Sequence, residues 1–283
     1  MKITDRYLSM LTASGKSPHT VESYNRVIKQ FESFLLDRKT DITNVNSLTV
    51  SEWTDELKVK QNTVRYNLIV LHGFYSWLLR HKKIKENPVF VEEIPPSKQI
   101  EYNLLDREDI NKLLNAAPEG KNALRDRAMV VLLLCSGLRS DELRSLTVSD
   151  LNFSEGFITV RHGKGDKQRN VPFPAAAQKA VTGYMNRYPH QGLLFQFNGK
   201  KMSSQGLNKI VKKYVLAVTG KEVHTHILRH AFASLCDDCG VPLRTIQKAL
   251  GHSSLATTEN IYVTVMNRTR AAQEVTAVLE KVC

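Results

Sequence analysis

The sequence predicts a mainly α-helical protein with a small β-sheet, built as two domains. Apolar residues recur at spacings of three and four along most of the chain, which is the period of amphipathic helices. Strand-like segments occur near residues 157–171, where a hairpin fits. The proline pair and polar content of residues 91–101 are typical of a connector. We therefore expect a helical domain over 1–90, a linker over 91–101 and a mixed α/β domain over 102–283.

Two long amphipathic helices dominate the expected first domain. Ser17 and Pro18 fit an N-cap and a first helical position, and apolar residues then follow at helical spacing. A second long helix is expected over 62–80, with shorter ones near 3–13 and 50–58. Apolar stripes of this kind usually face a core, so we interpret them as packing surfaces.

The expected second domain opens with helices near 106–116 and 121–136. The second of these ends before Gly137, which can adopt the left-handed conformation of a helix C-cap. Strands over 157–161 and 168–171 flank a turn that contains two glycines, as in a hairpin. Further helices are expected near 203–214, 229–239 and 243–250, and in the tail after Asn267.

The charge of the chain predicts a polyanionic partner. The formal net charge is +12; up to Lys98 the 15 Lys and Arg exceed the 11 Asp and Glu by 4, which leaves +8 for the rest. Neutralising phosphates releases counterions, so a basic chain favours nucleic acid. The longest apolar run, Ala128–Cys135, is too short to cross a bilayer, and the amino-terminal residues do not contain the apolar stretch expected of a signal peptide. We expect a cytoplasmic protein that binds double-stranded DNA and no membrane.

The four cysteines do not indicate a disulfide framework or a metal site. They are few for a chain of 283 residues, and disulfide frameworks belong to small secreted domains. Cys236 and Cys239 form a CxxC pair, but no second pair stands at zinc-ligand spacing. We expect no metal and no cofactor.

Seven polar residues stand in an order that suits phosphodiester chemistry: Arg139, Glu142, Lys164, His226, Arg229, His252 and Tyr262. Two arginines and a lysine can stabilise the charge that builds up on a phosphate, and a tyrosine hydroxyl can attack it once a base takes its proton. The set predicts cleavage of DNA without a metal ion.

Four segments resemble the signature blocks of the tyrosine recombinases, the phage-integrase and Xer family. They are Ser136–Leu143 (SGLRSDEL), His226–His230 (HILRH), Leu250–His252 (LGH) and Ile261–Tyr262 (IY). Four blocks in this order are a specific pattern, whereas one alone would be weak. The resemblance implies a SAM-like core-binding domain followed by a catalytic domain of the recombinase type, and a transposon-encoded resolvase-type member fits it.

The resemblance assigns Arg139 and Arg229 to the two non-bridging oxygens of the scissile phosphate, where guanidinium groups bind bidentately. It assigns Lys164 to the general acid that protonates the leaving 5'-oxygen. Lys167 and Arg169 share the hairpin turn and are both DNA-binding candidates and fallback candidates for this role.

The resemblance also makes Tyr262 the nucleophile, which would leave a 3'-phosphotyrosyl bond and a free 5'-hydroxyl. His226 would accept the tyrosine proton or orient the phosphate, and His252 would donate a hydrogen bond to it. We expect Glu142 to be a buried partner that orients an arginine or histidine, and His230 to support the site.

Basic residues of the first domain are further candidates for phosphate contact, although a single surface lysine is more often only solvated. The candidates are Lys58, Lys60, Arg65, Arg80, Lys82 and Lys83.

The tail carries an apolar stripe on an expected helix over about 267–283. In the family that the chain resembles, such a tail docks into a neighbouring protomer, which implies a tetramer on two duplexes and strand exchange through a Holliday junction. Packing of the tail on its own domain is the alternative.

Two other functions compete with recombination. A type IB topoisomerase uses similar tyrosine chemistry but reseals the same strand, and a DNA-binding accessory protein would need no aligned nucleophile. Dimer resolution, cointegrate resolution and integration or excision of a mobile element share the same chemistry. The sequence lacks room for a large arm-binding domain before its first helices, which favours resolution. Ile227 stands where an acidic residue often occurs in the family.

Overall fold

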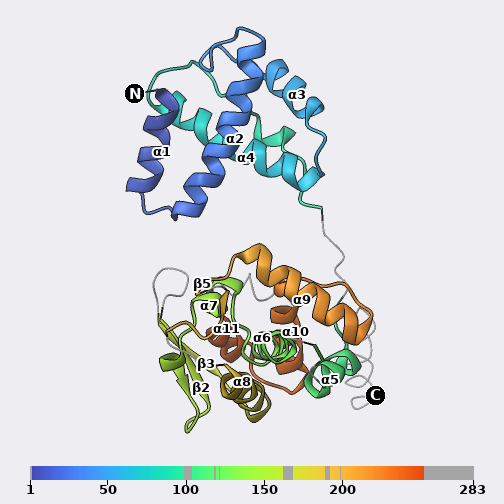
Figure 1. The fold of residues 1–283 in the computed structure, drawn as a ribbon. Helices are drawn as coiled ribbons and strands as arrows, with labels where there is room; N and C mark the ends of the chain where they lie inside the picture. The colour runs from blue at the N-terminus through green and yellow to red at the C-terminus, as the bar shows by residue number, and fades with distance from the viewer. Residues whose placement is uncertain are drawn as a thin grey trace, which may run out of the picture. The chain divides into compact units, whose positions relative to one another are not determined.

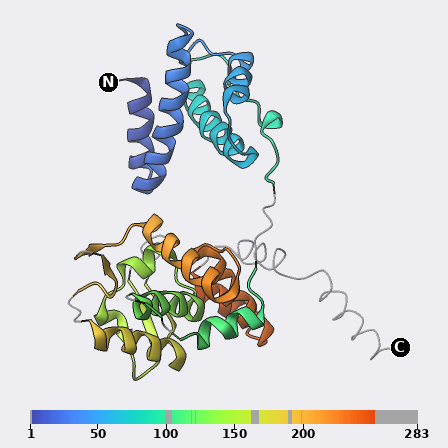
Figure 2. The ribbon, with the colours of Figure 1, turned by 45° about the vertical axis from the view of Figure 1, so that its right-hand side comes forward.

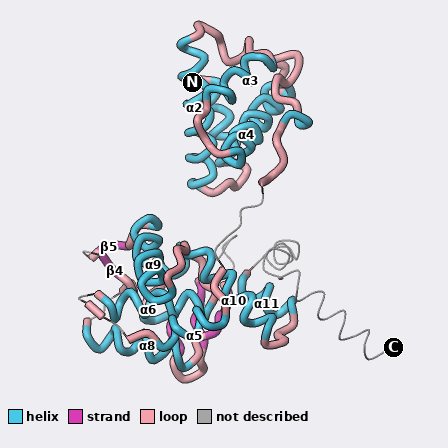
Figure 3. Tube along the Cα trace, turned by 90° about the vertical axis from the view of Figure 1, so that its right-hand side faces the viewer, coloured by secondary structure: helices cyan, strands magenta, loops and turns pink. Residues whose placement is uncertain are grey.

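The chain forms two compact units, Met1–Ile100 and Glu101–Cys283, each with its own hydrophobic core (Figure 1). The computed structural model describes residues 2–98, 104–117, 119–120, 122–161, 168–188, 192–197 and 199–251. Helices make up most of both units and the strands are short, as Figure 3 shows. The expected fold class is therefore confirmed.

The first unit is a helical domain. Its elements are α1 (Ile3–Ala13), α2 (Pro18–Asp37), α3 (Ser47–Glu56), α4 (Gln61–Arg80) and a 3-10 turn, η1 (Val91–Glu93). Ser17 caps α2, since its Oγ accepts from the backbone N–H of Thr20 at 3.2 Å, so the expected start of this helix is confirmed. The helices α1 and α2 lie side by side (Figure 2), and α2 also packs on α4 around buried aromatic rings that include Phe31, Trp53 and Phe74.

The stretch that follows α4, expected to be a connector, is bound to this helix over several residues. Asn62 makes a reciprocal pair with Lys98: its amide donates to the Lys98 carbonyl at 2.9 Å and its Oδ1 accepts from the Lys98 N–H at 2.8 Å. Nη1 of Arg65 donates to the carbonyl of Pro95 at 2.7 Å. The stretch expected to be a linker is therefore attached to the first unit as far as Lys98.

The second unit surrounds one central helix. Its helices are α5 (Arg107–Asn115), α6 (Ala123–Ser136), α7 (Ser140–Ser145), α8 (Ala175–Arg187), α9 (Ser204–Thr219), α10 (Thr225–Asp238) and α11 (Leu243–Leu250), with a 3-10 turn, η2 (Val148–Asp150). Side chains from 128 to 134 on α6 are buried on every face of the helix, and α6 packs against α8, α9 and α10 (Figure 1). A helix that is apolar all round belongs in a core.

A small antiparallel sheet lies beside these helices. Its strands are β1 (Leu151–Asn152), β2 (Phe157–Val160) and β3 (Arg169–Pro172) in the order β1-β2-β3, and Ile158 pairs with Val171. The expected hairpin is thus confirmed, with its turn outside the described residues. A second pair, β4 (Gln196–Phe197) and β5 (Lys200–Lys201), is also antiparallel.

The start of α10 differs from the sequence prediction, which began this helix at residue 229. The helix begins at Thr225, whose N–H and Oγ1 both donate to Oδ1 of Asn208 on α9, at 3.1 and 2.8 Å. A polar group from another helix therefore satisfies the first turn. As a result, His226 and Arg229 lie on one helix, one turn apart.

Candidate active site

Arg139 is placed by the tight turn between α6 and α7. Gly137 ends α6 in the left-handed conformation, with φ of +62°. A Cβ atom at this position would lie 2.5 Å from a ring carbon of Phe232 and 2.9 Å from a methyl group of Leu250, so the close packing also requires glycine. The N–H of Arg139, the N-cap residue of α7, donates to Oε2 of Glu142 in the first turn of this helix at 2.7 Å.

Glu142 is a buried carboxylate that binds two arginines. Its side chain is 5% exposed. Nη1 of Arg139 donates to its Oε1 at 3.0 Å, and the two Nη atoms of Arg169 donate to its two oxygens at 2.8 Å each. Burial alone would raise the pKa of Glu142, but the hydrogen bonds and charges of Arg169 and Arg139 lower it to about 2. The carboxylate is therefore ionised at neutral pH and orients both guanidinium groups.

Three arginines from three different elements converge on the carboxyl end of α11. Arg169, Arg229 and Arg139 donate, in this order, to the carbonyl oxygens of Ala249, Leu250 and Gly251, at 2.9, 2.6 and 2.8 Å. The last carbonyls of a helix have no partner within the helix and carry the negative end of its dipole, so guanidinium groups suit them. The next residue in the chain is His252.

Arg229 is almost completely buried, with 2% of its surface exposed. Its Nη1 donates to the carbonyl of Gly137 at 2.5 Å, which links α10 to the turn before Arg139. Burial and the charge of Arg139 lower the pKa of Arg229 to about 9. The guanidinium group therefore remains charged at neutral pH and makes the site strongly positive.

His226 and His230 lie one turn apart on α10, with ring centroids 4.7 Å apart. Burial lowers the pKa of His226, and the nearby charge of Arg229 lowers it further. Burial and the proximity of His226 lower the pKa of His230 to about 4. Both rings are therefore neutral at neutral pH, so each can accept a proton or a hydrogen bond.

The position of Arg169 corrects the expectation that it faces DNA from the hairpin turn. Arg169 is the first residue of β3, and its side chain is only 12% exposed. Each of its three guanidinium nitrogens donates to a protein acceptor, two to Glu142 and one to Ala249. The reason is the start of β3, which carries this arginine inward instead of leaving it in the turn.

The match to known families agrees with this geometry. Residues 103–268 match the model of the phage integrase family, and residues 4–82 match the model of its N-terminal SAM-like domain. The chain belongs to the phage integrase family. It is an enzyme of the tyrosine recombinase class, and the matched range includes the position of Tyr262.

Curated relatives of this recombinase match nearly its whole length. Tyrosine recombinase XerC of Syntrophus aciditrophicus is 32% identical over 97% of this chain and 96% of that protein. Tyrosine recombinase XerA of Pyrococcus furiosus is 32% identical over 93% of this chain and 90% of that protein.

Solved structures show the same fold. The crystal structure of a XerA recombinase matches with a TM-score of 0.55 and 25% identity over 97% of both chains. The Tn1549 transposon integrase in complex with transposon right end DNA matches with a TM-score of 0.75 and 20% identity, over 99% of this chain and 100% of that one. XerH bound to a palindromic difH substrate matches with a TM-score of 0.73 and 23% identity, over 95% of this chain and 82% of that one.

The structure brings together part of the expected site of the recombinase. Arg139, Glu142, His226 and Arg229 lie in one cluster, and His230 adjoins it. Lys164, Lys167, His252 and Tyr262 fall outside the described residues. Sequence reasoning missed the role of Arg169 as a partner of Glu142, because the two residues are 27 positions apart and no local pattern joins them.

The basic residues expected to bind DNA in the first unit form two separate groups. Lys58 and Lys60 precede α4, and Arg65 lies in its second turn; Arg80, Lys82 and Lys83 stand at its other end. A helix of 20 residues is about 30 Å long, so the two groups cannot contact the same phosphate. Arg65 differs from the others because it donates to the carbonyl of Pro95.

Within the described part of the chain, no group of three or more His, Cys, Asp or Glu side chains is placed to hold a metal ion. Cys236 and Cys239 are both free thiols, and burial raises the pKa of Cys236 to about 11. A thiol with so high a pKa is a poor nucleophile and a poor ligand at neutral pH. Among the same residues, none of the helices is both long and apolar enough to span a membrane.

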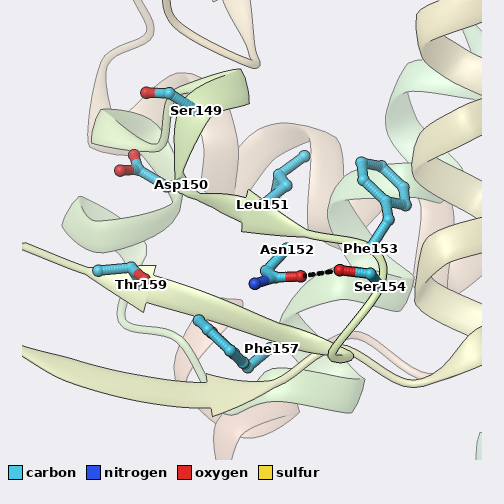
Figure 4. A pocket seen from close by; sticks show the side chains of 8 residues that line it. All are labelled: Ser149, Asp150, Leu151, Asn152, Phe153, Ser154, Phe157 and Thr159. Carbon is cyan, nitrogen blue, oxygen red and sulfur yellow. Dashed lines mark hydrogen bonds between the residues drawn. The ribbon is translucent and has the colours of Figure 1, made fainter.

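A surface pocket of about 560 Å³ lies over β1 and β2, and no member of the arginine cluster is among its lining residues (Figure 4). Its lining runs from Ser149 to Ser154 and includes Phe157 and Thr159. Asp150, its one ionisable lining residue, is paired with Nε of Arg161 at 2.5 Å. The pocket therefore offers no group for acid–base chemistry, and the candidate active site is the arginine cluster.

Proposed function

We propose that this recombinase cuts one strand of a DNA duplex by attack of Tyr262 on the scissile phosphate. The bond from Oη to phosphorus forms as the bond from phosphorus to the 5'-oxygen breaks, which leaves a 3'-phosphotyrosyl link and a free 5'-hydroxyl. The observation that carries the proposal is that Arg139 and Arg229 bind the last carbonyls of α11, at Gly251 and Leu250. The segment with His252 and Tyr262 therefore leaves directly from the arginine cluster.

Arg139 is suited to bind a non-bridging oxygen. A guanidinium group has five N–H donors, and the contacts to Glu142 and Gly251 use two of them. Its side chain is 28% exposed, so a phosphate can approach it. Arg229 supplies a second positive charge from the buried side of the cluster. Charge that is already in place lowers the barrier, because little reorganisation is needed when the phosphate gains charge.

Proton transfer completes the step. His226 accepts the proton of the Tyr262 hydroxyl, a role that its lowered pKa and its neutral form support. Lys164 donates a proton to the leaving 5'-oxygen, and His252 donates a hydrogen bond to the phosphate. The phosphotyrosyl link retains the energy of the phosphodiester, so an incoming 5'-hydroxyl reverses the step without ATP or metal.

We further propose that cleavage serves site-specific strand exchange between two duplex sites through a Holliday junction. The net charge of +12 supports DNA as the partner, as do related structures such as XerH bound to a difH substrate. The biological role is resolution of dimers or transposon cointegrates, or integration and excision of a mobile element. Four protomers act together on two duplexes by exchange of the tail at about 267–283.

A suicide substrate tests the chemistry. Wild type and Tyr262→Phe are incubated with EDTA on a nicked duplex that carries a binding site identified by selection from random DNA sequences. Denaturing gels then show whether a protein–DNA band survives SDS. We expect the band with wild type alone, while both proteins shift the duplex in native gels. A clean shift with no covalent band from wild type would overturn the proposed cleavage.

Removal of residues 267–283 tests the assembly. We expect the shortened chain to bind a single site as wild type does, but to lose the complex that holds two duplexes and four protomers, measured by light scattering on DNA. Tetramers of wild-type size from the shortened chain would overturn the exchange of the tail.

A further inference from the structure

The carboxyl end of α11 is held by a closed ring of polar contacts. Glu142 binds Arg139 and Arg169, and these two arginines bind the carbonyls of Gly251 and Ala249. The ring thus joins α7, β3 and α11. Glu142 and each of the two arginines therefore contact two other members of the ring.

Arg169 is the more enclosed of the two arginines in this ring. Its Nη1 and Nη2 each donate to Glu142 at 2.8 Å, and its Nε donates to Ala249 at 2.9 Å. Arg139, in contrast, makes one bond to the carboxylate through its side chain and is more than twice as exposed, at 28% against 12%. Arg139 is therefore the member that can reach a ligand, and Arg169 is the member that faces protein.

The absence of a Cβ atom at Gly251 leaves space for the guanidinium group of Arg169. A Cβ atom on Gly251 would lie 3.1 Å from Cδ and Nε and 3.2 Å from Cζ of Arg169, which is closer than a side chain normally tolerates. The φ of Gly251 is +63°, a conformation that favours glycine. The arginine therefore lies directly against the backbone from which His252 and the following segment depart.

We propose that Arg169 is a positioning residue for DNA cleavage: it fixes the carboxylate of Glu142, which aims Arg139, and it fixes the end of α11 from which the Tyr262 segment begins. This inference rests on the proposed function of Arg139 and Tyr262. Replacement of both partners of a buried ion pair by apolar side chains is often neutral for stability, whereas loss of one partner alone is destabilising, so precise placement is the better physical reason for the pair. Residues that orient metal ligands typically contribute about 10- to 100-fold to activity, and we expect an effect of this order for Arg169.

The test compares Arg169→Gln and Arg169→Lys with a matched control, Arg161→Gln. Arg161 follows β2, next to β3, and also pairs with a buried carboxylate, that of Asp150, but it touches no member of the ring. For each protein we measure DNA affinity, melting temperature and the single-turnover rate of covalent complex formation on the nicked duplex. We expect Arg169→Gln to slow cleavage about 10- to 100-fold, Arg169→Lys to lie between it and wild type, and Arg161→Gln to cleave at the wild-type rate, all with unchanged affinity.

A second substrate separates positioning from a general structural defect. In it, an uncharged methylphosphonate replaces the scissile phosphate, so a well-aimed Arg139 contributes less to the rate. If Arg169 acts through Arg139, the deficit of Arg169→Gln becomes smaller on this substrate. An equal deficit on both substrates would overturn the inference, as would a proportional loss of DNA affinity, which would instead indicate a phosphate contact by Arg169.

Two outcomes separate this inference from the proposed function. If wild type binds the site but forms no covalent complex, the proposed function fails and the inference fails with it. If wild type cleaves and Arg169→Gln cleaves equally fast, the inference alone fails. Should Arg169→Gln not fold, Arg169→Lys decides, because it keeps the positive charge and loses the bidentate geometry: slower cleavage at unchanged affinity supports the inference, and a wild-type rate overturns it.

Discussion

Replacement of Glu142 by glutamine tests the electrostatic account of the site. The carboxylate is 5% exposed and accepts hydrogen bonds from the backbone of Arg139 and from the side chains of Arg139 and Arg169. Glutamine keeps the size of the side chain but removes the charge that compensates these arginines. Buried positive charges without a partner are destabilising, so the second unit should lose stability.

The magnitude follows from the pKa. Glu142 has a pKa of about 2, compared with its ordinary value of 4.5. One unit of pKa is worth about 1.4 kcal/mol, so ionisation of Glu142 contributes about 3 kcal/mol to the stability of the folded state at pH 7. Because the folded pKa is the lower one, this contribution is complete above about pH 5, falls to roughly half by pH 3 and is lost below pH 2. Glu142→Gln should therefore cost about 3 kcal/mol at pH 7 and clearly less at pH 3.

Urea unfolding of the full chain measures this difference. Trp53 and Trp77, the two tryptophans of the chain, lie in the first unit, so their fluorescence serves as an internal control that should not change. Far-ultraviolet circular dichroism reports both units and should show an earlier transition of the second unit in the variant. A transition that shifts by the same free energy at pH 7 and pH 3, or not at all, would refute the electrostatic reasoning.

Three further predictions concern other parts of the chain. Gly137→Ala should destabilise the second unit by about 1–3 kcal/mol, because a Cβ atom would collide with Phe232 and φ is positive; an unchanged midpoint in circular dichroism would contradict this packing. Asn62→Ala should release the connector near Lys98, so limited proteolysis should cut residues 95–101 faster while tryptophan fluorescence melts as in wild type; equal cutting rates would show that the pair does not hold the connector. His226→Gln should slow cleavage about 10²- to 10⁴-fold. Because the pKa of His226 is lowered, wild-type cleavage should decline only below pH 6.5; a decline centred above this value would exclude the neutral ring as the base.

The sequence was most informative where one local pattern determines a structure. Apolar spacing predicted the two long helices of the first unit, and Ser17 with Pro18 predicted where α2 begins. Gly137 predicted the end of α6, since few other residues adopt a positive φ at a C-cap. The hairpin followed from two short strand-like segments.

Features that depend on contacts between distant residues could not be predicted in this way. The start of α10 depends on Asn208 of α9, which caps Thr225 from another helix. The short helix α7 has six residues, too few for a periodic pattern to identify. In the sequence, Arg169 cannot be distinguished from an exposed arginine in a turn. Only its contacts with Glu142 and Ala249 show that it is enclosed and bound to a buried carboxylate. The sequence identifies the charged residues, whereas the tertiary fold determines which groups each of them contacts.

Attack by Tyr262 is tested most directly by identifying the amino acid that becomes linked to DNA. Wild-type protein is trapped on the nicked duplex, the DNA is trimmed by nucleases, and the protein is digested for mass spectrometry. We expect a nucleotide attached through its 3'-phosphate to the peptide that contains Tyr262, and a free 5'-hydroxyl on the other DNA end. Attachment at another residue, or through a 5'-phosphate, would contradict it.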